Sequence, residues 1–147
     1  MKSDRPLSGN ERLADFRTLF LIAVGGAFGT ISRHELSLAV PVAAGTFPTT
    51  TLLINGVGAL VLGVLLGAAA GTAPNDRIMR PLLGVGFLGG FTTFSTFSVE
   101  TAQLARREHV ALAAIYVVAS ITLGLVAAYA GERLVHAEPR FVAEDEA

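Results

Sequence analysis

GFLGGFTTFSTFSVE, residues Gly86–Glu100, interrupts a long apolar segment with residue types that a membrane-spanning helix usually avoids. Two adjacent glycines, Gly89 and Gly90, are followed by small hydroxyl residues and by a phenylalanine at every third position. Glycine costs a helix about 1 kcal/mol relative to alanine, and Ser and Thr compete for its backbone hydrogen bonds. Non-helical backbone survives at membrane depth only where protein buries it or a polar cavity adjoins it. The stretch therefore predicts a helix break over Gly89–Thr93 with an ion or substrate site beside it.

Four apolar stretches, at about residues 18–40, 50–71, 81–104 and 110–134, are long enough to cross a bilayer. Each has about 20 residues or more, which at 1.5 Å per residue spans a hydrocarbon core of ~30 Å. Hydrophobic residues make up 52% of the 147, and the mean hydropathy is +0.58. A soluble four-helix bundle would need a charged stripe along each helix, whereas residues 50–71 contain no charge. The sequence predicts an all-α membrane protein with four transmembrane helices.

The two ends of the chain are polar and flank this membrane domain, which we place at residues 18–134. Residues 1–17 carry mixed charge, and the apolar run after them is longer than that of a signal peptide, so we expect a cytoplasmic extension. Residues 135–147 end in acidic side chains and are expected to form a solvated tail. With no cysteine in the chain, disulfides and thiolate metal sites are excluded.

Basic residues are distributed unequally between the two sides that four spans would define. Only Arg106 and Arg107 would lie on the side opposite the termini. The positive-inside rule therefore predicts a multi-pass protein with both termini in the cytoplasm and one fixed orientation. Eight basic residues would share the side of the termini: Lys2, Arg5, Arg12, Arg17, Arg77, Arg80, Arg133 and Arg140.

Small residues recur at four-residue spacing in three of the four predicted spans. Such stripes let helix backbones approach closely in lipid. Four helices with several such faces offer more packing surface than an isolated subunit uses, so we expect an oligomer. The stripes are Gly25 and Gly29; Ala59, Gly63 and Gly67; and Gly86 and Gly90.

Three segments resemble the signatures of the Fluc (CrcB-type) fluoride channels: GGFTTFSTF at Gly89–Phe97, GGAFGTISR at Gly25–Arg33 and TLLINGVGALVLG at Thr51–Gly63. The resemblance covers roughly residues 18–134 and leaves out both tails. It implies a fluoride-selective channel of the cell membrane, through which cytoplasmic fluoride leaves by passive diffusion, so that fluoride toxicity is reduced. It also implies an antiparallel dimer of oppositely inserted subunits.

The resemblance assigns roles to individual residues of an ion pathway. Phe94 and Phe97 match paired pore phenylalanines, whose positive ring edges would face a file of anions. Asn55 matches a pore-lining asparagine, and Arg33 matches an arginine that would make an electropositive vestibule. Hydroxyl groups are expected to complete the pathway, with the last two matching a polar track: Thr93, Ser95, Thr96, Tyr116 and Ser120.

A metal site is implied by the same resemblance. In the family, carbonyl groups from the broken third spans of two subunits coordinate a structural sodium ion at the dimer interface. Gly89 and Thr92 match those positions. Opened helical turns expose the oxygen ligands that hard cations prefer.

Purely structural interpretations of these residues stay open. Asn55 could bond a neighbouring helix, Arg33 could extend to the far membrane interface, and the phenylalanines could be core residues. Glu100 is expected to be a hydrogen-bonded structural carboxylate. The strong charge bias also departs from the weakly biased loops of many relatives. A homodimer and a heterodimer with an oppositely inserted homologue therefore both remain open.

Two other functions fit the sequence less well than a channel does. A small four-helix proton-coupled multidrug exporter would need a carboxylate in the middle of its first span, whereas Glu35 lies near the end of that span. A non-conducting membrane subunit would explain the glycine stripes but not the helix break. We do not expect an enzyme, because no nucleophile–base or metal-ligand spacing is present. The expected partners are fluoride, membrane lipid and a second subunit, with no nucleic acid.

Overall fold

The computed structural model describes residues 9–69 and 76–136, and helices account for nearly all of them. The first two helices are α1 (Gly9–Ala39) and α2 (Thr49–Ala69). The last helix is α6 (Val110–His136). Residues 1–8 and 137–147, which hold about half of the predicted extension and most of the predicted tail, lie outside the described residues. Helix α1 runs without interruption through the predicted boundary at residues 17 and 18.

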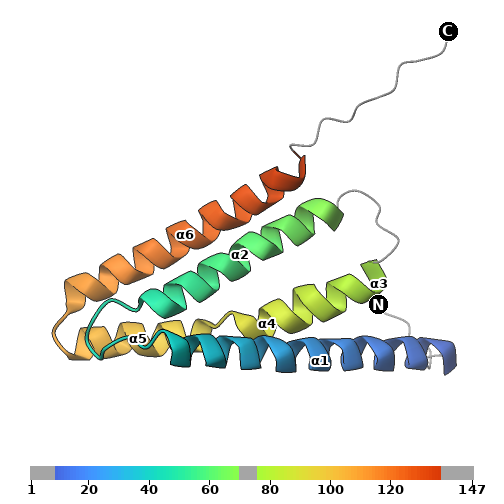
Figure 1. Ribbon diagram of the computed structural model, residues 1–147, viewed down its shortest axis with the longest axis horizontal. Coiled ribbons are helices and arrows are strands. Elements are labelled where there is room, and N and C mark those ends of the chain that lie inside the picture. The colour runs from blue at the N-terminus through green and yellow to red at the C-terminus, as the bar shows by residue number, and fades with distance from the viewer. Residues whose placement is uncertain (1–8, 70–75, 137–147) are drawn as a thin grey trace, which may run out of the picture.

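The predicted third span is made of four consecutive helical pieces, which run across the molecule in one direction (Figure 1). They are α3 (Asp76–Met79), the π-helix η1 (Arg80–Phe87), α4 (Leu88–Phe91) and α5 (Phe94–Arg106). Pro81 lies in the first turn of η1. Proline has no N–H and its ring crowds the preceding turn, so a regular α-helical turn is disfavoured where the wider π-helix begins.

Three helical stretches within the described residues are long and apolar enough to cross a membrane. They are Thr49–Ala68, Arg77–Arg106 and Val110–Val135. Large apolar side chains are exposed along them, such as Leu53 on α2 and Leu125 on α6. The all-α membrane class is therefore confirmed. Helix α1 is not among the three, so a fourth crossing stays a prediction.

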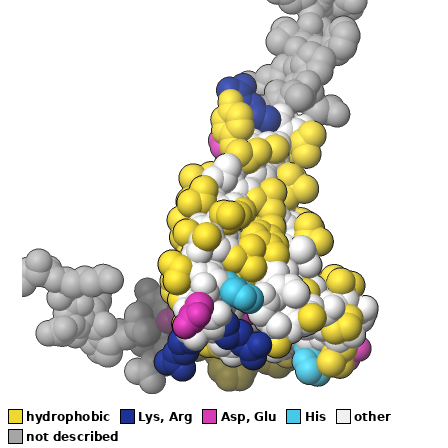
Figure 2. All heavy atoms as spheres, turned by 90° about the vertical axis from the view of Figure 1, so that its left-hand side faces the viewer, with side chains coloured by type: hydrophobic (Ala, Val, Ile, Leu, Met, Phe, Trp, Pro, Cys, Tyr) yellow, Lys and Arg dark blue, Asp and Glu magenta, His cyan; other side chains and the backbone are white. Residues whose placement is uncertain are grey.

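The helices pack in two pairs that are not neighbours in the sequence (Figure 1). Helix α1 lies along η1 and α4, while α2 lies along α6, and α5 contacts α6 to join the pairs. A small core forms at the α5–α6 contact. It contains Leu104, Ala113 and Tyr116, with Phe47 and Phe97 packed against them. Figure 2 faces the end of the molecule that carries the α5–α6 connection and shows charged and histidine side chains gathered there.

Glycines make both pairings close. A Cβ on Gly25 would overlap the carbonyl oxygen of Leu82 in η1, and one on Gly29 would overlap that of Phe87. In the other pair, a Cβ on Gly63 would overlap the backbone of Ala128 in α6. The predicted role of the stripes in helix packing is confirmed within the subunit.

Gly25→Ala should destabilise the protein, whereas Gly26→Ala should be tolerated. The first change places a methyl group against the backbone of η1, which cannot move aside without parting the helices. Overpacking of this kind costs about 1–3 kcal/mol. The second places it 3.8 Å from the Gly86 carbonyl oxygen, an ordinary contact. Thermal unfolding in detergent measures both variants, and equal melting temperatures would contradict the packing described here.

The helix break is shorter than predicted. Gly89 and Gly90 remain helical, and only Thr92 (φ −78°, ψ 158°) and Thr93 (φ −147°, ψ 120°) are extended. Gly90 serves the packing of α4 on α1, because a Cβ there would overlap the Gly26 carbonyl oxygen. Gly90 therefore allows the close approach of α1, and the two threonines make the break.

Candidate functional site

The extended segment is held by the side chain of Asn55 on α2. Its Oδ1 accepts a hydrogen bond from the Thr93 N–H at 2.8 Å, and its Nδ2 donates to the Thr93 carbonyl at 3.0 Å. The amide thus pairs with both backbone groups of one residue, as a neighbouring strand would. Asn55 therefore bonds the neighbouring third span, in agreement with the structural interpretation of this residue. The second Nδ2 hydrogen has no acceptor within the described part of the chain.

The same pairing releases backbone carbonyls at the end of α4. The Thr93 N–H would bond the Gly89 carbonyl in a continuous helix, but it donates to Asn55 instead. The Thr96 N–H would bond the Thr92 carbonyl, but it donates to the Thr93 hydroxyl at 3.1 Å. Both carbonyl oxygens therefore lose their regular helical donors. Such oxygens are the ligands that a hard cation takes.

Thr93 also starts α5 as its N-cap. Its hydroxyl oxygen lies 3.0 Å from Thr96 Oγ1, to which it donates, and 3.2 Å from the exposed Ser95 Oγ. Three of the predicted pathway hydroxyls thus form one cluster at the first turn of α5. Ser and Thr commonly cap helices in this way. The cluster fixes the direction in which α5 leaves the break.

Arg33 reaches the break from the opposite side. Its Nε donates to the Gly90 carbonyl at 3.1 Å, so the side chain turns to α4 instead of extending to the far interface. The three segments singled out in the sequence, which contain Arg33, Asn55 and Thr93, therefore converge on one interruption of the third span.

A cavity of about 410 Å³ opens beside the break. Phe94 projects at its edge with 80% of its surface exposed. The rings of Phe94 and Phe97 are 5.7 Å apart. The lining comes from α2 and from the third span: Asn55, Gly58, Ala59, Leu62, Gly84, Leu88, Gly89, Thr92, Thr93, Phe94 and Phe97.

Further along α5, Glu100 accepts two hydroxyl hydrogen bonds. Thr51 Oγ1 donates to its Oε1 at 2.8 Å, and the Tyr116 hydroxyl donates to its Oε2 at 2.8 Å. The Tyr116 ring is fully buried and lies 5.2 Å from that of Phe97. The expectation of a hydrogen-bonded carboxylate at Glu100 is confirmed. Thr51 is not among the predicted site residues, although it is one of three consecutive threonines at the start of an uncharged span.

Tyr116→Phe should lower stability, whereas Tyr129→Phe should not. The first change keeps the ring packing but removes a hydrogen bond to a carboxylate, worth about 1.5–3 kcal/mol. The second removes an exposed hydroxyl that only accepts from Arg133 Nε. Unfolding in detergent compares the two. If Tyr116→Phe unfolds at the wild-type temperature, the Glu100 contact is not stabilising.

Ser120 does not meet the other predicted pathway residues within the subunit. Its buried Oγ has no hydrogen-bond partner among the described residues, and it does not line the cavity at the break. A buried hydroxyl without a partner is uncommon. Within the described ranges no group of three or more His, Cys, Asp or Glu side chains could hold a metal.

Residues 20–132 match the family described as CrcB-like protein, Camphor Resistance (CrcB). The chain belongs to this CrcB-like family. The match includes each residue placed at the break and all but the last residues of the final span.

Several relatives of this CrcB-like chain are named as fluoride-specific ion channels. The Mycobacterium bovis protein named Fluoride-specific ion channel FluC 1 is 43% identical over 122 residues, which are 82% of this chain and 92% of the relative. The Sphingopyxis alaskensis Fluoride-specific ion channel FluC is 42% identical over 123 residues, 83% and 98% of the two chains. Fluoride-specific ion channel FluC 3 of Streptomyces avermitilis is 44% identical over 109 residues, 74% of this chain but 53% of that longer protein. The chain thus spans about half the length of this last relative.

Proposed function

We propose that this chain is a subunit of a fluoride-selective channel through which cytoplasmic fluoride leaves the cell passively. The observation that carries the proposal is the convergence of Arg33, Asn55 and Thr93 on the interrupted third span. Relatives at about 43% identity over most of the chain bear the name of fluoride-specific channels. Ion channels of this family are not enzymes, and the chain acts by conduction alone.

The pathway runs along the cavity beside the break. The second Nδ2 hydrogen of Asn55 and the Thr96 hydroxyl donate hydrogen bonds to a dehydrated anion. The Thr93 hydroxyl, which donates to Thr96 Oγ1, and the Ser95 hydroxyl complete the polar cluster beside it. The exposed edge of Phe94 offers weaker stabilisation. Weak sites in series suit conduction, since an ion that binds strongly would not leave. Tyr116 and Ser120 on α6 continue the pathway, and Arg33 raises the local anion concentration at its mouth.

The functional unit is an antiparallel dimer. Gly84, Gly89 and Gly124 face space that the subunit does not fill, since a Cβ on any of them would meet nothing within 4 Å. The carbonyl groups of Gly89 and Thr92, which lack their helical donors, hold a structural sodium ion where two subunits meet. Helix α1 completes four spans, because its residues 19–31 are almost entirely apolar and α1 runs alongside η1 and α4.

Purified chain in liposomes should release fluoride but not chloride. No proton or sodium gradient should be needed, because passive diffusion along a narrow polar path supplies the transport. A fluoride electrode and a chloride electrode measure the two effluxes from matched vesicles. Equal chloride efflux, or an absolute requirement for proton exchange, would rule out the channel.

Orientation distinguishes the two kinds of dimer. The excess of basic residues beside the termini favours one orientation, and a heterodimer with an oppositely inserted homologue follows from it. A tag at the carboxyl terminus should be accessible from one side only in cells expressing this chain alone. An even split between the two sides would instead support a dual-topology homodimer.

A further inference from the structure

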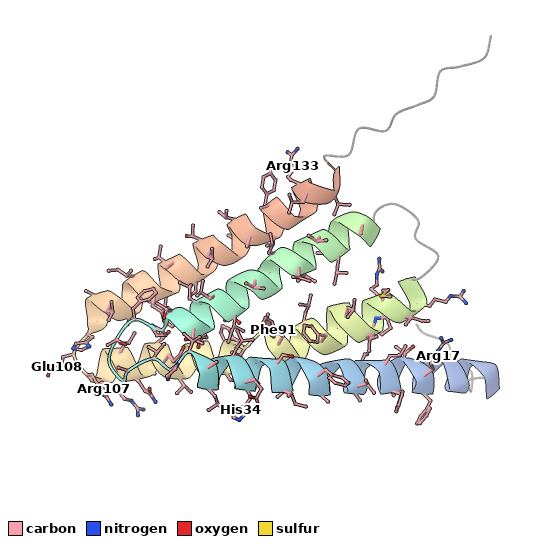
Figure 3. The ribbon with its side chains drawn as sticks, viewed as in Figure 1. Arg17, His34, Phe91, Arg107, Glu108 and Arg133 are labelled. Atoms are coloured by element: carbon pink, nitrogen blue, oxygen red, sulfur yellow. The ribbon has the colours of Figure 1, made fainter. Side chains whose placement is uncertain are left out.

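A basic cavity of about 630 Å³ lies between α1 and the beginning of the third span, far from the break. Arg17, labelled in Figure 3, lies at this end of the molecule, and Arg107 lies at the opposite end. The lining combines arginines from three helices and one threonine with apolar side chains: Arg17, Arg77, Arg80, Thr18, Ile22, Pro81 and Val85.

The cavity exists because the close contact between α1 and η1 ends there. Gly86 lies so close to α1 that a Cβ on it would be 2.7 Å from the Ile22 carbonyl oxygen. Toward the start of both helices, arginines and Pro81 replace the glycines, and their bulk keeps the helices apart. Ile22 and Val85 each follow an arginine by five residues, about 7.5 Å further along the helix axis. The cavity is thus basic toward the start of the two helices and apolar further along them, where Val85 is exposed.

The Arg17 and Arg77 guanidinium groups at the rim are available to a ligand. Arg17, Arg77 and Arg80 are all exposed, and neither Arg17 nor Arg77 forms an ion pair within the part of the chain that the structure describes. Asp15 lies two positions before Arg17, so it points away from the cavity on α1. Guanidinium groups bind phosphate oxygens through paired charge-assisted hydrogen bonds.

We propose that this cavity binds an anionic phospholipid, with the phosphate at Arg17 and Arg77 and an acyl chain along Ile22 and Val85. A soluble anion would gain nothing from the exposed apolar part of the cavity, whereas a lipid matches both the basic part and the apolar part. Basic pockets between membrane helices on the cytoplasmic side are suited to anionic headgroups. The bound lipid would tie α1 to the third span and does not depend on conduction.

Native mass spectrometry of the full chain in detergent, with phosphatidylglycerol or phosphatidylcholine added at equal concentration, tests the site. The test variant is Arg17→Gln with Arg77→Gln. The matched control is Arg133→Gln, which removes an exposed cation at the same end of the molecule but on α6. Size-exclusion chromatography checks that each variant is folded, and inorganic phosphate serves as a soluble competitor.

Wild type should retain phosphatidylglycerol in preference to phosphatidylcholine, and the double variant should lose roughly 25-fold of this retention. Each arginine near a lipid surface contributes about 1 kcal/mol, which is about fivefold. The control should bind as wild type does. Equal retention of the two lipids, unchanged retention in the double variant, the same loss in the control, or displacement by equimolar inorganic phosphate would each overturn the lipid site.

Discussion

Asn55→Leu should reduce fluoride efflux from liposomes to that of empty vesicles. The change keeps the size of the side chain but removes both hydrogen bonds to Thr93. Each backbone group then left unpaired in a buried site costs about 1–3 kcal/mol. The extended segment would lose its support and the cavity its amide donor. Efflux measured with a fluoride electrode, together with thermal unfolding, records both effects.

Gln103→Leu is the matched control for this change. It also replaces an amide by leucine, but at an exposed position on α5, away from the break. We expect wild-type efflux and stability from it. Should Asn55→Leu conduct at the wild-type rate with an unchanged melting temperature, the pairing with Thr93 would have no part in holding the pathway.

Phe94→Ile and Phe97→Ile should both reduce fluoride efflux, by about tenfold, while differing in stability. Isoleucine keeps an apolar bulk but removes the ring, whose edge is worth about 0.5–1.5 kcal/mol in contacts of this kind. Phe94 is 80% exposed in the subunit, so its loss should leave subunit folding unchanged. Phe97 contacts the Tyr116 ring, and its loss should also lower the melting temperature.

The comparison needs a phenylalanine that is exposed but distant from the cavity. Phe20 on α1 is 58% exposed and meets this requirement. Phe20→Ile should leave efflux unchanged. Unchanged efflux in both Phe94→Ile and Phe97→Ile would mean that the two rings only pack.

The existence of the helix break was predictable from the sequence, but its position was not. The composition of residues 89–96 disfavours a regular helix anywhere within it, and propensity alone cannot choose among neighbouring residues. The choice is made by contacts with other helices. Gly90 packs closely against α1, and Asn55 forms hydrogen bonds with Thr93, which is 38 residues away in the chain.

The hydrogen-bond partners of the polar residues could likewise not be predicted from the sequence. That a buried amide, guanidinium or carboxylate needs a partner follows from the cost of desolvation. Which partner it finds depends on how the helices are arranged. Arg33 was expected at a vestibule and bonds the Gly90 carbonyl, while Glu100 was expected to be hydrogen-bonded and is held by Thr51 and Tyr116. The assignment of these residues to an ion pathway stays a prediction.

The close packing of glycine stripes followed from their four-residue period, because that spacing places small residues on one helical face. The choice of partner helix did not follow, since α1 and α2 carry similar stripes and pack against different neighbours. Side-chain shape, rather than period, distinguishes these surfaces.

The pairing of helices that are not adjacent in sequence governs the order of events during synthesis on the ribosome. Helix α2 packs mainly on α6, the last helix to emerge. At ~5–20 residues per second, α2 waits in the bilayer for several seconds before its partner exists. During that interval the face around Gly63 meets lipid or another newly made chain. Truncation before Val110 would make that exposure permanent, so quality-control proteases should degrade such fragments faster than the full chain.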